Sequence, residues 1–134
     1  MELKGTHTFA APPQTVWNAL HDSTILKNSI PGAESVAWQG DNAVTLSGGM
    51  GPIKGTLTAQ VESQPPSRMT FTVNRSSLQG ALTVDLAPSG SGTLVTYSAT
   101  ANASGPIGAA MTMAQGMIKK GVDDFFAKMD SQLQ

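Results

Sequence analysis

Nearly all of the chain between Ala33 and Ala103 alternates apolar and polar positions, interrupted only by short turn sequences. Such alternation is typical of half-buried β-strands. We expect six strands in this stretch, after a first strand that contains Leu3, His7 and Phe9. Turns such as Gly40-Asp41-Asn42 and Pro88-Ser89-Gly90-Ser91-Gly92 separate them. Because strands joined by short turns pair with their neighbours, the pattern predicts a seven-stranded antiparallel sheet.

Helical patterns flank this β-rich stretch. Pro12 and Pro13 open a short helix, since a missing N–H does no harm at a helix start. Asp22 caps a second short helix, which ends at Pro31-Gly32. A single long helix is predicted from Ser104 onward. Its apolar positions recur at three- and four-residue spacing and are Ile107, Met111, Ala114, Ile118, Val122, Phe125 and Met129.

This order of elements predicts one α+β domain over residues 1–134, with a curved sheet wrapped around the last helix. One helix cannot pack tightly against a long sheet everywhere, so we expect a cavity between the two. Several inward strand positions are small, namely Gly48, Gly55, Gly80, Ala99 and Ala101. Two interpretations stay open: these residues leave room for a pocket, or they let the strands bend.

Composition excludes several classes of function. Disulfides and thiolate chemistry are excluded because the chain has no cysteine. Its net charge is −1 with no basic stripe, which argues against nucleic-acid binding. Charged residues make up only 13% of the chain, and a weakly charged surface suits docking on a partner or a membrane. We see neither a signal peptide nor a transmembrane stretch and expect a cytoplasmic protein.

Residues suited to catalysis are few. Of the two histidines, we expect His7 to be hydrogen-bonded within the core or cavity and His21 to interact with a helix end. Neither a metal-ligand spacing nor a nucleophile or phosphate-binding motif is present. Glu34, Asp85 and Arg75 fall in strand regions, and Arg75 either reaches the cavity mouth or lies beyond the buried stretch.

Two runs of the sequence carry specific motifs. The run APPQTVWNALHDSTILKNSIPGAES contains Pro, Val-Trp, Leu-x-Asp, Leu and Ile-Pro-Gly in that order, and GMGPIKGTLTAQV contains a Gly-Pro-x-Lys-Gly turn. In these motifs the chain resembles the CoxG family of carbon monoxide dehydrogenase accessory proteins. The agreement returns at Gly80, Gly92-Thr93, Tyr97 and IKKGVDDFF. The resemblance implies the helix-grip fold of the START-like or Bet v 1-like (SRPBCC) superfamily, with a hydrophobic cavity.

The resemblance also implies a role. Members of this family are non-catalytic accessory proteins, thought to recruit molybdenum-flavin hydroxylases of the carbon monoxide dehydrogenase type to the cytoplasmic membrane. A cavity for a lipophilic molecule fits that role, because electrons must reach the membrane quinone pool. Many members carry a tail beyond the last helix, whereas the present sequence ends at Gln134. We therefore expect either transient membrane contact, at the inner face of the cytoplasmic membrane, or a different partner enzyme.

Our first hypothesis is a binding module that takes an isoprenoid quinone or another lipid between the long helix and the sheet. Flexible methionines near that gap support it, among them Met50, Met69, Met111, Met113 and Met117. We expect no other cofactor and no metal. The predicted lining residues are Leu46, Met50, Phe71, Leu82, Tyr97, Met111, Ile118 and Val122, with the Tyr97 hydroxyl offered to a ligand oxygen.

Two alternatives accompany this hypothesis. One is a docking or assembly subunit without a physiological ligand, which contacts the hydroxylase through the segment from Asn28 to Ala33. The other is a small START-like cyclase or hydrolase. Such an enzyme needs a titratable group inside the cavity, and His7 and Tyr97 are the candidates.

Overall fold

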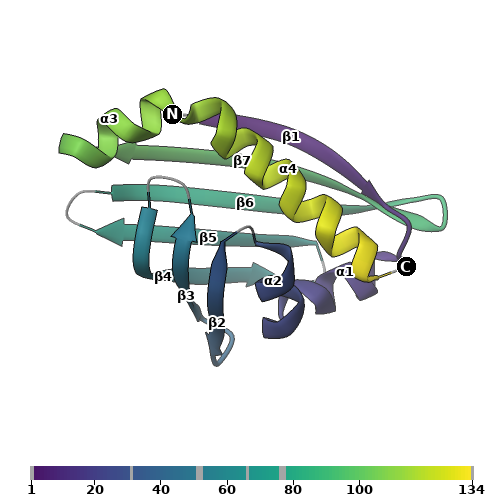
Figure 1. The fold of residues 1–134 in the computed structure, drawn as a ribbon. Coiled ribbons are helices and arrows are strands. Elements are labelled where there is room, and N and C mark those ends of the chain that lie inside the picture. The colour runs from purple at the N-terminus through teal and green to yellow at the C-terminus, as the bar shows by residue number, and fades with distance from the viewer. Residues whose placement is uncertain (1, 31, 51–52, 66, 76–77, 134) are drawn as a thin grey trace.

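The chain folds into an antiparallel sheet that curves around a C-terminal helix, as the sequence predicts (Figure 1). The strands are β1 (Glu2–Phe9), β2 (Ala33–Gln39), β3 (Ala43–Met50), β4 (Ile53–Gln64), β5 (Arg68–Arg75), β6 (Leu78–Ser89) and β7 (Gly92–Ala103). In the described part of the chain these seven strands pair in the order β1-β7-β6-β5-β4-β3-β2. The helices are α1 (Pro13–Leu20), α2 (Ser23–Ser29), α3 (Gly105–Met113) and α4 (Gln115–Gln132).

This computed structural model describes residues 2–30, 32–50, 53–65, 67–75 and 78–133. The side chains at positions 49, 50, 53, 54, 75, 107 and 110 lie outside the description. Two residues singled out in the sequence, Met50 and Arg75, are thus placed on their strands by backbone alone.

The inward face of the sheet follows the predicted parity. On β6 the residues Leu78, Val84 and Leu86 are buried, and on β7 so are Val95 and Tyr97. Hydrogen-bond register aligns these positions in rows across the sheet. Burial of alternate apolar side chains on one face is the main stabilising term for such a sheet.

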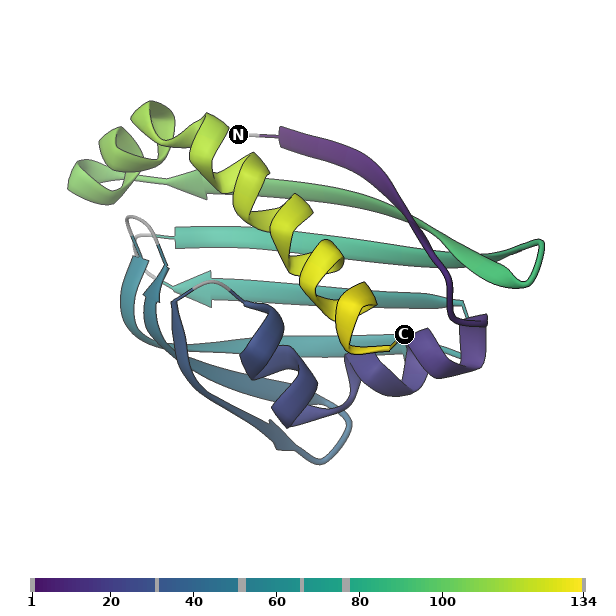
Figure 2. The same ribbon diagram turned by 45° about the vertical axis from the view of Figure 1, so that its right-hand side comes forward.

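The two short helices close one end of the sheet, and α2 contacts the C-terminal part of α4 (Figure 2). As expected, Asp22 caps α2, and its Oδ1 accepts hydrogen bonds from the amides of Thr24 and Ile25 at 2.9 and 3.1 Å. At the other end of α2, the fully buried Ser29 accepts a 2.7 Å hydrogen bond from Nε2 of Gln132. This bond ties α2 to the last turn of α4.

The C-terminal helical region differs from the expectation of one uninterrupted helix. It is divided at Ala114 into α3 and α4, which run in different directions (Figure 1). A Cβ at Gly108 would lie 2.5 Å from the carbonyl oxygen of Ala103, so α3 approaches the end of β7 as closely as glycine allows. That contact sets the direction of α3, whereas α4 packs through Phe126 on Tyr97 of β7 and Phe9 of β1.

The core contact of α4 is Phe126, which the predicted apolar face omits in favour of Phe125. Phe126 is 1% exposed, and its ring stacks on Tyr97 at 5.3 Å and meets Phe9 edge-on at 6.3 Å. Phe125 is only half-buried. Phe126 replaces Phe125 because α4 crosses the sheet diagonally. The set of residues that faces the sheet therefore shifts by one position along the helix.

Two of the small strand residues mark a bend. Gly48 and Gly55 face each other across β3 and β4, and their φ angles are +145° and +104°. Residues with a side chain rarely adopt such angles, so here the interpretation that glycine permits strand bending is correct. At Ala99 and Ala101 the strand is regular, and both residues are half-buried on the inward face.

Replacing Gly5 tests how closely β1 fits beneath Tyr97. A Cβ at Gly5 would lie 2.6 Å from Cζ of Tyr97, so Gly5→Ala overfills the core. We expect a loss of about 1–3 kcal/mol of unfolding free energy in urea titrations. Gly121→Ala on α4 is the control, because nothing lies within 4 Å of its Cβ. It should raise stability by up to about 1 kcal/mol, and equal effects of the two changes would contradict the assigned packing.

Candidate functional site

The predicted lining residues fall into two neighbouring groups. Phe71, Leu82 and Val122 pack against the main core that contains Tyr97. Met111 and Ile118 belong to a smaller cluster with Leu57 and Leu78, nearer α3. Leu46 is half-buried and pairs in register with Leu57, and the side chain of Met50 lies outside the described residues. Whether these residues line one ligand site stays a prediction.

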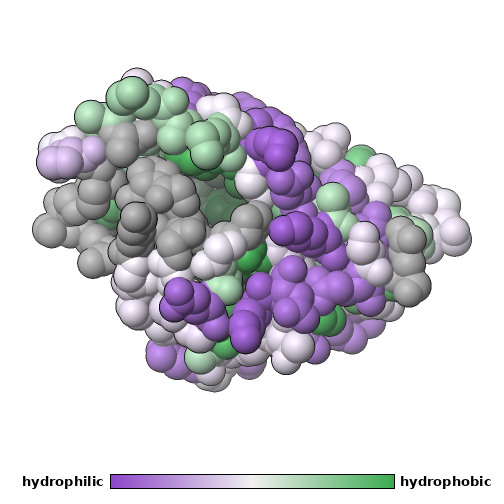
Figure 3. Space-filling view, in the orientation of Figure 1, coloured by the Kyte–Doolittle hydropathy of each residue, from purple (hydrophilic) through white to green (hydrophobic). Residues whose placement is uncertain are grey.

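The middle of the inward face is incompletely covered. Phe71 and Leu82 are register neighbours in the centre of the sheet, and both are half-buried although they point toward the helix side. Val122, on α4 above the sheet, is also half-buried. In the space-filling view the surface is hollowed beside α4, with a hydrophobic floor (Figure 3). Solvent thus reaches apolar side chains that a closed core would bury.

A small hollow lies between α3 and the end of β7. Its volume is about 190 Å³, below the roughly 300–1,000 Å³ of typical ligand pockets. The lining residues are Ala101, Asn102, Ala103, Gly108, Met111, Thr112 and Gln115. Of the predicted set only Met111 contributes to it. The sequence did not single out the polar residues of this hollow, because their strand and helix positions look like ordinary exposed ones.

The Tyr97 hydroxyl is engaged by the helix. It donates a 2.6 Å hydrogen bond to Oδ1 of Asp123, whose Oδ2 accepts a 2.7 Å bond from Nζ of Lys119. The lysine also lies over the tyrosine ring, 5.6 Å from its centroid. A ligand oxygen would have to displace Asp123 to reach this hydroxyl. The Lys119–Asp123 pair has the i,i+4 spacing usual for ion pairs on a helix, but its link to Tyr97 was not foreseen.

These contacts shift the ionisation of the groups involved. The hydrogen bond from Lys119, followed by that from Tyr97, holds the pKa of Asp123 below its usual value. Burial, followed by the hydrogen bond to Asp123, raises the pKa of Tyr97. Tyr97 therefore stays a neutral donor and Asp123 an ionised acceptor over the neutral pH range.

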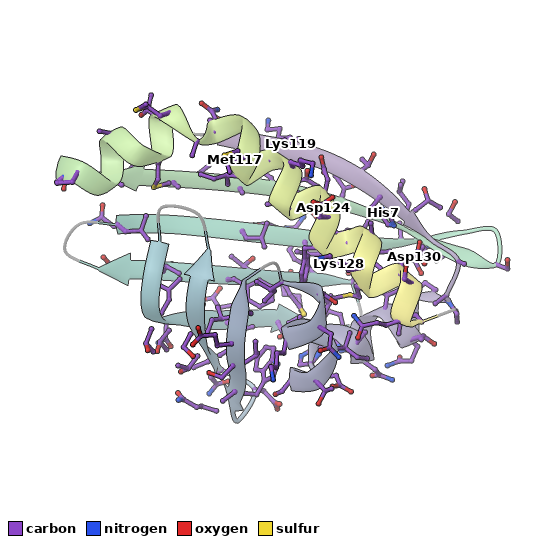
Figure 4. The ribbon with its side chains drawn as sticks, viewed as in Figure 1. His7, Met117, Lys119, Asp124, Lys128 and Asp130 are labelled. Atoms are coloured by element: carbon purple, nitrogen blue, oxygen red, sulfur yellow. The ribbon has the colours of Figure 1, made fainter. Side chains whose placement is uncertain are left out.

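The histidines have the structural partners expected of them. Nε2 of His7 lies 3.1 Å from Oδ2 of Asp130, and in Figure 4 His7 on β1 faces Asp130 on α4. Nδ1 of His21 lies 2.9 Å from the carbonyl oxygen of Trp17, at the C-terminal end of α1. A carbonyl oxygen can only accept a hydrogen bond, so Nδ1 of His21 is assigned as the protonated donor.

Among the described side chains, the remaining charged candidates do not converge on a site. Asp85 on β6 accepts a 2.6 Å hydrogen bond from Nε of Arg68 on the neighbouring strand β5, and that bond raises the pKa of Arg68. Glu34 is exposed on β2, and the side chain of Arg75 lies outside the described residues. Among the residues that the structure describes, no group of three or more His, Cys, Asp or Glu is arranged to hold a metal ion.

Comparison with known proteins assigns the chain to a family. The model of a family described as polyketide cyclase/dehydrase and lipid transport matches residues 1–134. The chain belongs to that family. No curated protein matches the sequence.

Solved structures share this fold. A conserved protein from Geobacillus kaustophilus is 25% identical with a TM-score of 0.81, over 99% of this chain and 95% of its own. A START superfamily protein from Mycobacterium smegmatis is 14% identical with a TM-score of 0.80, over 99% of each chain. These likenesses confirm the predicted helix-grip fold. Within the described residues, no helix has the length and apolar character needed to cross a membrane.

Replacing Asp123 tests its link to Tyr97. Because the pKa of Asp123 is lowered in the folded state, its charge stabilises the fold above the unfolded pKa of about 3.9, and this contribution is lost as pH falls through the folded pKa. We expect Asp123→Asn to lower the melting temperature at pH 7 and to weaken its dependence on pH below 4.

The matched control is Asp124→Asn, at the next position of α4. It removes a looser ion pair, in which Oδ2 of Asp124 lies 3.5 Å from Nζ of Lys120. It should change the melting temperature less. If both variants show the same acid titration of stability, Asp123 has no special role in fixing α4.

Proposed function

We propose that this protein is a non-catalytic accessory protein that binds a lipophilic ligand, a quinone or another lipid, on the inward face of its sheet. It serves a molybdenum hydroxylase of the carbon monoxide dehydrogenase type and brings that enzyme to the membrane. The observation that carries the ligand-binding part is the incomplete burial of Phe71 and Leu82 on the sheet and of Val122 on α4. The family description, which includes lipid transport, supports the same part.

The physical basis of binding is removal of apolar surface from water. An isoprenoid chain laid over these side chains gains about 25 cal/mol per Å² of buried apolar area. The hollow of about 190 Å³ beneath α3 continues the same inward face through Ala101 and Met111. Neither opening alone encloses a long chain, so the proposed ligand lies along the sheet and ends in the hollow.

The partner enzyme and the membrane contact rest on the CoxG-like motifs of the sequence. These motifs include the Ile30-Pro31-Gly32 corner and the run GMGPIKGTLTAQV with its Gly-Pro-x-Lys-Gly turn. In the structure Ile30 ends α2, where its amide donates to the carbonyl oxygen of Leu26, while Asn28 and Gly32 are exposed. Pro31 lies outside the described residues.

An enzymatic role is less well supported. Each of the two titratable candidates, His7 and Tyr97, contacts a carboxylate of α4, at 3.1 and 2.6 Å respectively. These contacts fasten the helix to the sheet, and a general acid or base would have to leave them to reach a substrate.

Native mass spectrometry with organic extraction tests ligand binding directly. We expect a quinone or lipid to co-purify with the protein from its host. Phe71→Gln should weaken rebinding of the extracted molecule about tenfold, because a polar amide replaces apolar contact area. Thr72→Gln is the matched control, since Thr72 is exposed on the opposite face of β5. If no lipophilic molecule binds the wild-type protein, the carrier function is wrong.

The docking alternative is favoured by one specific feature. Met113 and Met117 are 89% and 73% exposed where α3 meets α4, so the prediction that these two methionines lie near the gap between helix and sheet is wrong. The stretch of sequence between Asp85 and Lys119, which contains both methionines, has no charged residue. Exposed large apolar side chains commonly mark interaction surfaces, and these two methionines make a second candidate contact for the hydroxylase.

The double substitution Met113→Gln and Met117→Gln tests this surface. We expect it to reduce capture of the purified hydroxylase severalfold in pull-down assays while leaving ligand extraction unchanged. Leu94→Gln, which alters another exposed apolar residue on β7, is the control. Equal capture by both variants would remove the methionines from the interface.

A further inference from the structure

The indole nitrogen of Trp38 is a buried donor without an acceptor. Trp38 lies on the inward face of β2, where its register partner on β3 is the buried Val44. Within the described residues, Nε1 is inaccessible to water and has no hydrogen-bond partner. An indole N–H can only donate, so no rotation of the group turns it into an acceptor. Native proteins rarely leave such a group unpaired.

The rings around Trp38 lead to the proposed ligand face. The imidazole of His21 stacks on the indole with centroids 5.2 Å apart, and the ring of Phe71 lies 6.5 Å away. Phe71 is half-buried and pairs in register with Leu82. A molecule lying over Phe71 is thus adjacent to the indole.

The chemistry of this surrounding favours one kind of acceptor. A single water on Nε1 would need two to four polar partners, and the ring neighbours Phe71 and His21 offer few. A carbonyl oxygen on an otherwise apolar molecule requires only one donor, and its body gains from apolar contact. The single indole N–H of Trp38, beside the rings of Phe71 and His21, suits such a molecule.

We infer that Trp38 is the polar recognition residue of the ligand site and selects lipophilic molecules that carry a carbonyl acceptor. This inference rests on the proposed ligand-binding function and names the ligand class within it. The indole as a whole is half-buried, so a ligand that displaces a neighbouring side chain reaches the N–H. Trp38 then determines which apolar molecule binds, while the sheet provides most of the contact area.

The experiment compares two probes of matched shape, 2-methyl-1,4-naphthoquinone and 2-methylnaphthalene. Because the chain has no cysteine, the quinone forms no thiol adduct. The chain has two tryptophans, so its ¹H–¹⁵N spectrum holds two indole signals, assigned with Trp38→Phe and Trp17→Phe. We expect the quinone, and not the hydrocarbon, to shift the Trp38 indole signal downfield.

Calorimetric titration supplies the affinities. We expect the quinone to bind wild-type protein about fivefold to tenfold more tightly than the hydrocarbon, as a single net hydrogen bond allows. Trp38→Phe should abolish that preference while keeping hydrocarbon affinity, and Trp17→Phe should retain it. Thermal unfolding shows whether each variant is folded, and Trp38→Phe should be at least as stable as wild type because it removes an unpaired donor.

The outcomes separate the two proposals. If both probes bind equally and the Trp38 signal does not shift, the carbonyl selectivity is wrong while ligand binding stands. A preference that survives in Trp38→Phe also overturns the role of Trp38. If neither probe binds and host-purified protein yields no lipophilic molecule, the ligand-binding function and this inference fail together.

Discussion

The packing of Phe126 into the concave side of the sheet is the contact on which the arrangement of the whole molecule depends. Its ring contacts Tyr97 of β7 and Phe9 of β1, and it lies one residue from the half-buried Phe125. Met129, one turn later, is fully buried. Together these contacts fix the C-terminal half of α4, and α2 is fastened to that half through Ser29. The direction of α4 across the sheet follows from this anchor.

The same anchor explains why the inward face stays open elsewhere. A straight helix touches a curved sheet along a limited stretch, and the two surfaces separate beyond it. Ile118 and Val122 of α4 are therefore only half-buried, as are Phe71 and Leu82 beneath them. The change of direction at Ala114 takes α3 to the end of β7, where a small hollow remains. The incomplete coverage of the inward face thus results from the geometry that stabilises the fold.

Polar groups on the inward face differ in whether they have a hydrogen-bond partner. Tyr97 and His7 are satisfied by Asp123 and Asp130, which α4 places above them. These bonds hold the helix on the sheet and restrict the chemistry that either group can perform. Trp38 lies on β2, away from these two carboxylates of α4, and its indole N–H has no acceptor in the described part of the chain. In the proposed binding mode, the polar group of the ligand therefore binds on the β2 side of the sheet.

The sequence by itself determined the α+β class, the order of the strands and of the first two helices, and the inward parity of the sheet, because alternation, helical spacing, caps and turns are local properties of the chain. It also indicated that His7 would be hydrogen-bonded, since it shares a strand face with Phe9. Only the tertiary structure decided that Phe126 anchors α4, that Asp123 takes the Tyr97 hydroxyl and that the last helix divides at Ala114. Those outcomes depend on the crossing direction of α4 over a curved sheet, which arises from contacts between residues far apart in the chain.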